Sequence, residues 1–236
     1  MLWEMKAIIL AAGVGKRLQP FTNKIPKALV KVNGIPIIER QIEYFLEIGV
    51  SEIVIVTGYL SEQLDYLASK YDRLRLIHNE QYEEYNNIYS VYLVKDRMGD
   101  SYVSEADVFM HRNYLIPQPT RSCYFGGFRR GFAHEWILRF DEHGRIYRID
   151  VEGGAGVILA GLSYWTTEDA RILRNELEDK IREGNFGGLY WDDIHMANLD
   201  KLDVFLQEIE TSAWTEIDTP EDLEEAHERE KRYRST

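Results

Sequence analysis

The sequence predicts an α/β fold, with a doubly wound, mostly parallel sheet of the Rossmann-like kind and a small mixed β extension. Between residues 6 and 107, short apolar runs alternate with segments of helical periodicity, which is typical of right-handed β-α-β crossovers. After residue 107 the apolar runs mostly follow one another directly. A chain of 236 residues, 44% of them hydrophobic, can bury a full core. We therefore expect a single domain over residues 1–236, with one half at 6–107 and the other at 108–236.

The first half alternates strands with helices. Strands are expected at residues 7–10, 53–56, 74–77 and 101–103, where apolar residues run together as in buried parallel strands. The first helix is expected to begin at Pro36 and end at Gly49, because apolar residues recur between them at helical spacing. Ser61 is the expected N-cap of the second helix, and residues 87–98 predict the third.

The second half is richer in strands. These are expected at residues 123–128, 136–140, 145–151 and 156–164, joined by glycine-rich turns, with His143 and Gly144 at a hairpin tip. A helix is expected at residues 168–183, ending at Gly184, and a charged helix at 221–232. We interpret this half as an extension of the same sheet.

Charge and composition exclude several classes of protein. Against 40 Asp and Glu residues there are 28 Lys and Arg residues, and the net charge of −12 argues against nucleic acid but not against a nucleotide ligand. No apolar run approaches the roughly 20 residues of a membrane-spanning helix, and the first residues lack a basic-then-apolar signal. Cys123 is the only cysteine and the histidines lack metal-ligand spacing, so neither a disulfide framework nor a zinc site is expected. We expect a cytoplasmic protein without membrane insertion.

The loop after the first strand is the most informative stretch. It combines two glycines with three nearby cations: Gly13, Gly15, Lys16, Arg17 and Lys27. Small residues let backbone N–H groups approach phosphate oxygens, and cations supply charge where an anion would bind. The spacing fits neither a Walker A loop nor the dinucleotide fingerprint, in which Leu18 would have to be glycine. An ordinary turn is the alternative, but the combination of motifs favours a phosphate site.

The same stretch resembles the signature of nucleotidyltransferases that transfer a nucleotide from a triphosphate to a phosphorylated acceptor. The resemblance rests on residues 10–18 (LAAGVGKRL) and 26–29 (PKAL). Later segments resemble the bacterial phosphocholine cytidylyltransferases and their relatives for 2-aminoethylphosphonate: 85–90 (YNNIYS), 105–107 (EAD), 135–136 (EW), 189–192 (LYWD) and 216–218 (EID). The resemblance covers residues 6–223. It implies the nucleotidyltransferase fold, with CTP bound mainly by residues 6–107 and the acceptor and metal by 108–236.

For the nucleotide, the resemblance implies that the glycine loop surrounds the triphosphate of CTP. Lys27 and Arg17 are then the catalytic cations, acting on the phosphates in the transition state. Asn86 and Ser90 would bind the cytosine or the ribose, since an amide offers both a donor and an acceptor, and a helix start is the alternative role of Asn86. The implied CTP-binding residues are Leu10, Ala11, Ala12, Gly13, Val14, Gly15, Lys16, Asn86, Ser90 and Ala106.

The resemblance also implies Mg²⁺ as the cofactor, bound by Asp107, Asp218 and Glu216. Asp107 follows an expected strand at the sheet edge where ligands bind, and Mg²⁺ needs only one or two carboxylates beside phosphate oxygens. Asp218 also suits the start of the helix after Pro220, and the two roles are compatible. Glu105 departs from the Asp-Ala-Asp pattern of the family, which leaves the metal role of Asp107 intact but alters the acceptor side.

Aromatic residues flanked by acids mark the implied acceptor site. An aromatic face beside a carboxylate can hold an ammonium group, although core packing is the alternative for each ring. Arginines would hold the acceptor's phosphate or phosphonate by bidentate contacts. The implied acceptor residues are Glu135, Trp136, Arg112, Arg129, Tyr190, Asp192 and Glu216, with Arg130, Trp191 and Asp193 beside them.

The expected reaction is attack of an acceptor oxygen on the α-phosphorus of CTP, with release of pyrophosphate. The acceptor is a small amine-bearing phosphonate or phosphate, with 2-aminoethylphosphonate slightly favoured over phosphocholine. Two alternatives stay open: a sugar-1-phosphate nucleotidyltransferase and a non-catalytic nucleotide-binding module. The presence of Lys27, Asp107 and Asp218 together argues against the second.

Overall fold

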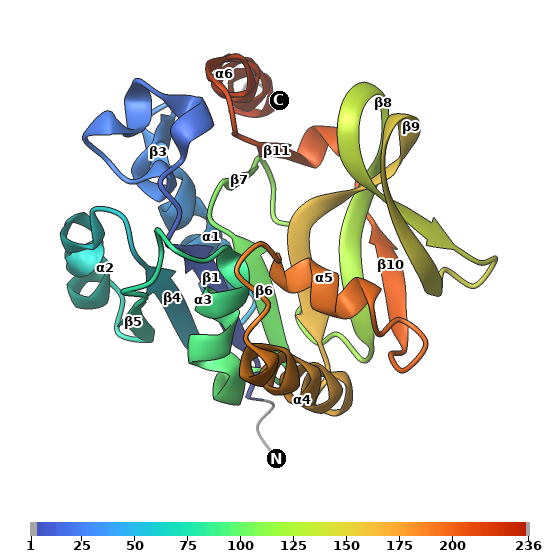
Figure 1. Cartoon of the computed structure of the whole chain (residues 1–236). Coiled ribbons are helices and arrows are strands. Elements are labelled where there is room, and N and C mark those ends of the chain that lie inside the picture. Colours follow the sequence, from blue (N-terminus) through green and yellow to red (C-terminus); the bar gives the residue numbers. More distant parts are fainter. Residues whose placement is uncertain (1–3, 235–236) are drawn as a thin grey trace.

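A mostly parallel sheet forms the centre of the molecule. The computed structural model describes residues 4–234, so the ends of the predicted domain, 1–3 and 235–236, lie outside the described residues. The strands of the sheet are β1 (Lys6–Ala11), β4 (Glu52–Thr57), β5 (Leu74–His78), β6 (Ser101–Glu105), β8 (Ser122–Phe140), β9 (Ile146–Trp165) and β10 (Val204–Glu208). Their order is β10-β8-β9-β6-β1-β4-β5, and β9 runs antiparallel to both of its neighbours while the other pairs are parallel (Figure 1). The predicted fold class is confirmed.

Helices cover both faces of this sheet. They are α1 (Ile37–Glu47), α2 (Asp65–Lys70), α3 (Asn87–Val94), α4 (Thr167–Glu183), α5 (Trp191–Met196) and α6 (Pro220–Arg234). Two small antiparallel sheets pair β2 (Lys31–Val32) with β3 (Ile35–Pro36), and β7 (Val108–Met110) with β11 (Trp214–Glu216). Figure 1 shows α6 beyond β11, at the end of the molecule where the strands of the first half terminate. Among the described residues, no helix is long and apolar enough to cross a membrane.

The burial of β1 explains why its sequence is apolar throughout. Ala7 and Ile9 belong to a core with α1, while Ile8 and Leu10 belong to a second core with α3 and α4. A strand that is buried on both faces needs apolar residues at every position. The continuous apolar run in the sequence is therefore the direct consequence of helices on both sides of the sheet.

The register of the parallel strands creates the edge at which a ligand can bind. Ala11 pairs with Thr57 and Thr57 with His78, so β1, β4 and β5 end level with one another. Glu105, the last residue of β6, pairs with Leu10. Loops that follow these strands are thus held side by side, as ligand sites in open α/β sheets require.

The long hairpin of β8 and β9 corrects one prediction. The glycine-rich segments near residues 131 and 154 do not end strands; they bend two continuous strands, with shifts of register around Arg130, Phe132 and Glu135. Positive φ angles of 76° at Gly131 and 131° at Gly154 allow this bending. The predicted hairpin tip is confirmed, because Asp141 to Arg145 forms the turn between the strands.

The predictions of helix ends were confirmed in part, and several short elements were not predicted. Ser61 is not an N-cap, since the chain forms a 3-10 turn at Ser61–Leu64 before α2 begins. The predicted stop at Gly184 is confirmed by its φ of 77°, and the side chain of Thr166 caps the start of the same helix. The sequence analysis missed α5, β10, β7 and β11, which are short and have weak periodicity.

Candidate active site

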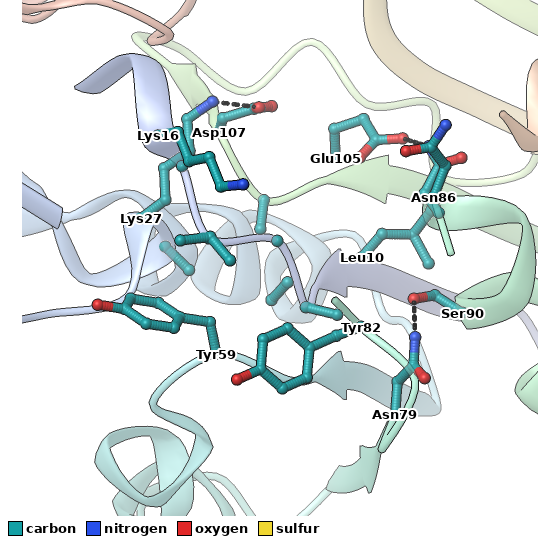
Figure 2. Close-up of a pocket in the computed structure, with 18 of the residues that line it drawn as sticks. Leu10, Lys16, Lys27, Tyr59, Asn79, Tyr82, Asn86, Ser90, Glu105 and Asp107 are labelled. Atoms are coloured by element: carbon teal, nitrogen blue, oxygen red, sulfur yellow. Dashed lines mark hydrogen bonds and ion pairs between the residues drawn. The ribbon is translucent and has the colours of Figure 1, made fainter. Parts of the chain in front are cut away.

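The glycine loop lines a cavity at the carboxyl edge of the sheet. The loop leaves β1 at Ala11 and enters a 3-10 turn at Lys16–Leu18. The cavity has a volume of about 750 Å³, and Figure 2 shows side chains from the loop, from the end of β6 and from α3 around it. All residues predicted to bind CTP line it: Leu10, Ala11, Ala12, Gly13, Val14, Gly15, Lys16, Asn86, Ser90 and Ala106.

Gly15 is the position in the loop that requires glycine. Its φ is 65°, in the left-handed region, and an added Cβ would lie 3.1 Å from Lys27 Cβ and 3.1 Å from Thr22 Cγ2. The Thr22 hydroxyl donates a 2.8 Å hydrogen bond to the Gly15 carbonyl. At Gly13, in contrast, an added Cβ would have no neighbour within 4 Å. The loop is thus packed against Lys27 and Thr22 at Gly15. At Gly13 it borders open space, in which a phosphate has room.

Lys27 lies between two carboxylates. Its Nζ is 2.7 Å from Asp107 Oδ2 and 2.5 Å from Asp218 Oδ1, and Arg17 Nη2 is 2.9 Å from Asp218 Oδ2. Burial alone would lower the pKa of the Lys27 ammonium, but the two carboxylates outweigh burial and raise that pKa. Lys27 is therefore charged at any physiological pH, and the two residues predicted to be catalytic meet at one acid.

Three carboxylates beside Lys27 form a candidate metal centre. Asp107, Glu216 and Asp218 each offer one oxygen, and these oxygens lie within 4.8 Å of one another. Among the described residues, Asp107 Oδ1 is buried without a hydrogen-bond partner. A buried, unpaired carboxylate oxygen is unfavourable unless a cation binds it, and Mg²⁺ prefers oxygen ligands. The residues predicted as metal ligands are thus brought together and fit a hard divalent cation.

The pairing of β7 with β11 brings these acids together from distant parts of the chain. Val108 pairs with Glu216, and the Ile217 N–H donates a 3.0 Å hydrogen bond to the Asp107 carbonyl. Asp218 lies two residues after the end of β11, but it does not cap α6 with its side chain. Thr219 does so instead, since its Oγ1 accepts a 3.2 Å hydrogen bond from the Asp222 N–H, and Asp222 Oδ2 in turn accepts hydrogen bonds of 3.0 Å and 2.8 Å from the N–H groups of residues 218 and 219. The Asp218 carboxylate is left to face the cations.

Glu105 and Glu216 add two further carboxyl groups to this region. Burial raises the pKa of Glu105 and of Glu216, and the Asp107 carboxylate raises both further. The Asn87 amide opposes this effect at Glu105, because its Nδ2 donates a 2.8 Å hydrogen bond to Glu105 Oε1. Carboxylates crowded in this way form a place where a bound cation is strongly favoured.

Amide and aromatic side chains line the far end of the first cavity. Asn79 Nδ2 donates a 3.0 Å hydrogen bond to Ser90 Oγ, and both residues are buried (Figure 2). Asn86 occupies the N-cap position of α3, but its side chain does not bind the N–H groups of the helix. Its Nδ2 instead donates a 3.0 Å hydrogen bond to the Gly188 carbonyl. Sequence reasoning missed Asn79, Tyr59 and Tyr82 in this wall. Asn79 directly follows β5 at the carboxyl edge, a signal that would have identified it.

A second cavity of about 480 Å³ adjoins the first. Both are lined by Arg17, Asn87, Glu105, Asp107, Tyr190 and Asp218. Its wall is strongly acidic and also includes Glu135, Asp192, Glu216 and Asp222. The rings of Trp136 and Tyr190 meet edge to face, with centroids 6.4 Å apart. The second cavity therefore combines aromatic faces with excess carboxylate, as predicted for a cationic acceptor group.

Two predicted arginines lie outside this second cavity. Arg112 Nη2 is 2.8 Å from Glu210 Oε2, because β7 runs away from the metal centre and carries Arg112 with it. Arg130 lies with its guanidinium carbon 5.4 Å from the centre of the Phe128 ring. It neighbours Arg129, which does line the cavity, and successive residues of a strand point to opposite faces.

The aromatic and acidic residues of α5 divide in a similar way. Asp192 lines the cavity, but Asp193 Oδ2 accepts a 2.7 Å hydrogen bond from the Tyr190 N–H and so caps the helix. Trp191 touches the cavity but is only 5% exposed and packs on Trp165, so core packing accounts for it. The sequence analysis also missed two cavity residues on β8, Tyr124 and His134. Tyr124 lies in an apolar run that gave no polar signal.

Comparison with known proteins extends these observations to the whole chain. Residues 7–103 match the MobA-like NTP transferase domain family. The chain is 43% identical to choline-phosphate cytidylyltransferase of Streptococcus pneumoniae, over 95% of this chain and 97% of that protein. It is 37% identical to 2-aminoethylphosphonate cytidylyltransferase of Lancefieldella rimae, over 93% of this chain and 91% of that protein.

A solved structure agrees with the sequence comparison. CTP:phosphocholine cytidylyltransferase from Streptococcus pneumoniae matches with a TM-score of 0.93 and 42% identity, over 95% of this chain and 98% of that one. The fold is thus common to nearly the full length of both chains, and the predicted family and enzyme class are confirmed. The protein is a nucleotidyltransferase and belongs to the family of the choline-phosphate and 2-aminoethylphosphonate cytidylyltransferases.

Proposed function

We propose that this protein transfers CMP from CTP to a small amine-bearing phosphonate or phosphate, in a Mg²⁺-dependent reaction that releases pyrophosphate. The proposal rests on one observation: the two cavities share Asp107 and Asp218, the two acids that Lys27 contacts. One cavity offers the glycine loop to a triphosphate, and the other offers aromatic faces and carboxylates to an ammonium group. The proposed acceptor is 2-aminoethylphosphonate, and phosphocholine is the alternative.

In this proposal the chain acts mainly by alignment and charge. The backbone of residues 11–16 holds the triphosphate, and Asn86 and Ser90, assisted by Asn79, hold the nucleoside. Lys27 and Arg17 stabilise the charge that develops on the phosphates. The acceptor oxygen is already ionised near neutral pH, so no general base is required.

Asp107, Asp218 and Glu216 would hold the metal ion. When bound, Mg²⁺ neutralises charge on phosphate oxygens. The phosphates of CTP would give the Lys27 ammonium new anionic partners in place of the two carboxylates that it contacts in the structure, and those carboxylates would then be available to the metal ion. The same three acids and Lys27 argue against a non-catalytic binding module.

The acceptor site follows from the second cavity. The ammonium group would lie against Trp136 and Tyr190, with Asp192 and Glu216 as counter-charges. Arg129 would hold the phosphorus group, and Glu135 would orient Arg129, whose charge acts on the Glu135 carboxyl. A sugar phosphate brings no cation to balance these acids, which disfavours the sugar-1-phosphate alternative.

We also propose that the chain works as one cytoplasmic domain. Residues 6–107 supply most of the CTP site and residues 108–236 most of the acceptor and metal sites. The division is incomplete, because Tyr190 and Asp218 of the second half line the first cavity as well.

A panel of acceptors tests the function. Pyrophosphate release is measured with CTP and Mg²⁺ against 2-aminoethylphosphonate, phosphocholine, ethyl phosphate and glucose 1-phosphate, and then with UTP or ATP in place of CTP. We expect turnover with an amine-bearing acceptor and CTP. Equal turnover with ethyl phosphate would show that the protein has no pocket for an ammonium group. Turnover with glucose 1-phosphate alone would establish the sugar-1-phosphate alternative.

A further inference from the structure

A buried tyrosine and histidine stand behind the acceptor cavity and contact one of its acids. Tyr124 projects from β8, and its hydroxyl donates a 3.0 Å hydrogen bond to Asp192 Oδ1. The same hydroxyl contacts Nδ1 of His195, which lies one turn after Asp192 on α5. Tyr124 is 2% exposed and His195 0% exposed. The proposed reaction assigns no role to His195.

The proton positions in this chain of contacts follow from the geometry. Asp192 is a carboxylate, so it accepts the only hydrogen of the Tyr124 hydroxyl. The contact between that hydroxyl oxygen and His195 then needs a hydrogen on Nδ1. Burial lowers the pKa of His195, so the neutral ring carries one N–H. The hydrogen bonds therefore run in one direction, from His195 Nδ1 through the Tyr124 hydroxyl to Asp192.

The surroundings of His195 are otherwise those of an apolar side chain. The ring centroids of Trp191 and Trp165 lie 3.8 Å and 4.4 Å from that of the imidazole. Among the described residues, Nε2 is buried and has no hydrogen-bond partner. A buried unpaired nitrogen lowers the stability of the fold, whereas a leucine would leave no polar atom unpaired. Packing therefore does not account for a histidine at this position.

We propose that Tyr124 and His195 are positioning residues for the acceptor: they fix the Asp192 carboxylate toward the ammonium group. This inference rests on the proposed function, since it assigns the ammonium to Asp192. A fixed, hydrogen-bonded carboxylate loses less freedom when the cation binds than a mobile one does. The arrangement affects the acceptor alone, because neither Tyr124 nor His195 lines the nucleotide cavity.

Four variants test this assignment through the kinetics of pyrophosphate release. Tyr124→Phe removes the hydroxyl, and His195→Leu removes the Nδ1 donor. His195→Asn places an amide N–H near the position of Nδ1 and is the rescue variant. The matched control is Tyr102→Phe, since Tyr102 is also fully buried but donates a 2.7 Å hydrogen bond to the Ile116 carbonyl, away from both cavities.

The expected results separate positioning from a structural role. Tyr124→Phe should raise KM for the acceptor by roughly tenfold and leave KM for CTP within about twofold. His195→Leu should also raise KM for the acceptor, without loss of thermal stability. In both His195→Asn and Tyr102→Phe, the acceptor KM should stay near that of the parent. In an Asp192→Asn background, Tyr124→Phe should have little further effect, because the two residues act through one group.

The outcomes that would contradict the positioning role differ from those that would contradict the proposed function. An unchanged acceptor KM in Tyr124→Phe, or equal increases in KM for CTP and acceptor, would overturn the positioning role. Additive effects of Tyr124→Phe and Asp192→Asn would do the same. If the parent enzyme turned over no amine-bearing acceptor at all, the proposed function itself would fail, independently of these variants.

Discussion

The first cavity, which we propose binds the nucleotide, and the second, which we propose binds the acceptor, have opposite chemistry. One wall of the nucleotide cavity is the loop after β1, and the cations of this cavity are Lys16, Arg17 and Lys27. The acceptor cavity is built from side chains of β8, β9, α5 and β11, and carboxylates dominate it. Recognition by backbone depends on local geometry, whereas recognition by side chains depends on the tertiary arrangement of distant segments.

The difference in charge matches the two ends of the proposed reaction. A triphosphate requires cations and N–H donors, while an ammonium requires carboxylates and aromatic faces. The opposite charges meet where Lys27 and Arg17 contact Asp107 and Asp218. Variants in the first and the second cavity should therefore change different kinetic constants. Variants at the boundary between the cavities, where these charges meet, should lower kcat.

Removal of the metal ion should have the largest effect, because it acts on the boundary itself. We expect excess EDTA to reduce turnover on the order of 1000-fold or more, since a bound divalent cation contributes several kcal/mol to charge stabilisation. The measurement is pyrophosphate release before and after chelation, with Mg²⁺ added back as the control. Undiminished turnover in EDTA would contradict the role of Asp107 and Asp218.

Lys27→Ala should lower kcat by about 100-fold, which corresponds to about 3 kcal/mol of lost transition-state stabilisation. KM for CTP should change only a few-fold, because the loop still holds the triphosphate. The matched control is Lys31→Ala, at an exposed lysine that lines neither cavity. A higher KM for CTP with kcat nearly unchanged would make Lys27 a ground-state binding residue instead.

Variants of the acceptor cavity should distinguish the two acceptors. A quaternary ammonium depends on aromatic faces, which contribute about 1–2 kcal/mol when desolvated, so Trp136→Ala should harm phosphocholine more. A primary ammonium has three N–H donors, so Asp192→Asn or Glu216→Gln should harm 2-aminoethylphosphonate more. The measurement is KM for the acceptor in each combination of variant and acceptor. Equal losses with both acceptors would show that the amine is not recognised in this way.

Glu216→Gln should stabilise the free protein while weakening its activity. Burial and nearby carboxylates raise the pKa of Glu216 in the folded state, so the folded chain holds its proton at pH values where the unfolded chain has lost it. Stability from this group is therefore present at low pH and is lost as pH rises through the folded-state pKa. In EDTA near pH 8 we expect Tm to rise by roughly 3 °C, the effect of about 1 kcal/mol in a domain of this size.

The control for this prediction is Glu208→Gln, at an exposed residue of β10. Near pH 4, where the glutamate is mostly protonated in both states, Glu216→Gln and the parent should differ much less in Tm than they do near pH 8. A lower Tm for Glu216→Gln at both pH values would mean that the carboxylate is stabilised rather than strained in the fold.

The sequence by itself determined the sheet, the loop and the family of this protein. Residues 7–10 are apolar without interruption because both faces of β1 are buried, and the glycine loop follows within a few residues, so local patterns contain the information. The residues of this loop that line the first cavity were therefore predictable. Asp107 was also predictable, since it lies two residues after the end of a parallel strand.

Only the tertiary structure decided which acids and cations act together. The pairing of β7 with β11 places Glu216 and Asp218 beside Asp107, and the same pairing carries Arg112 away to Glu210. Tyr124 and His195 gave no signal because they lie 71 positions apart and meet only through the packing of α5 on β8. Contacts between residues so far apart depend on loop lengths, strand register and helix packing, which short-range periodicity does not contain.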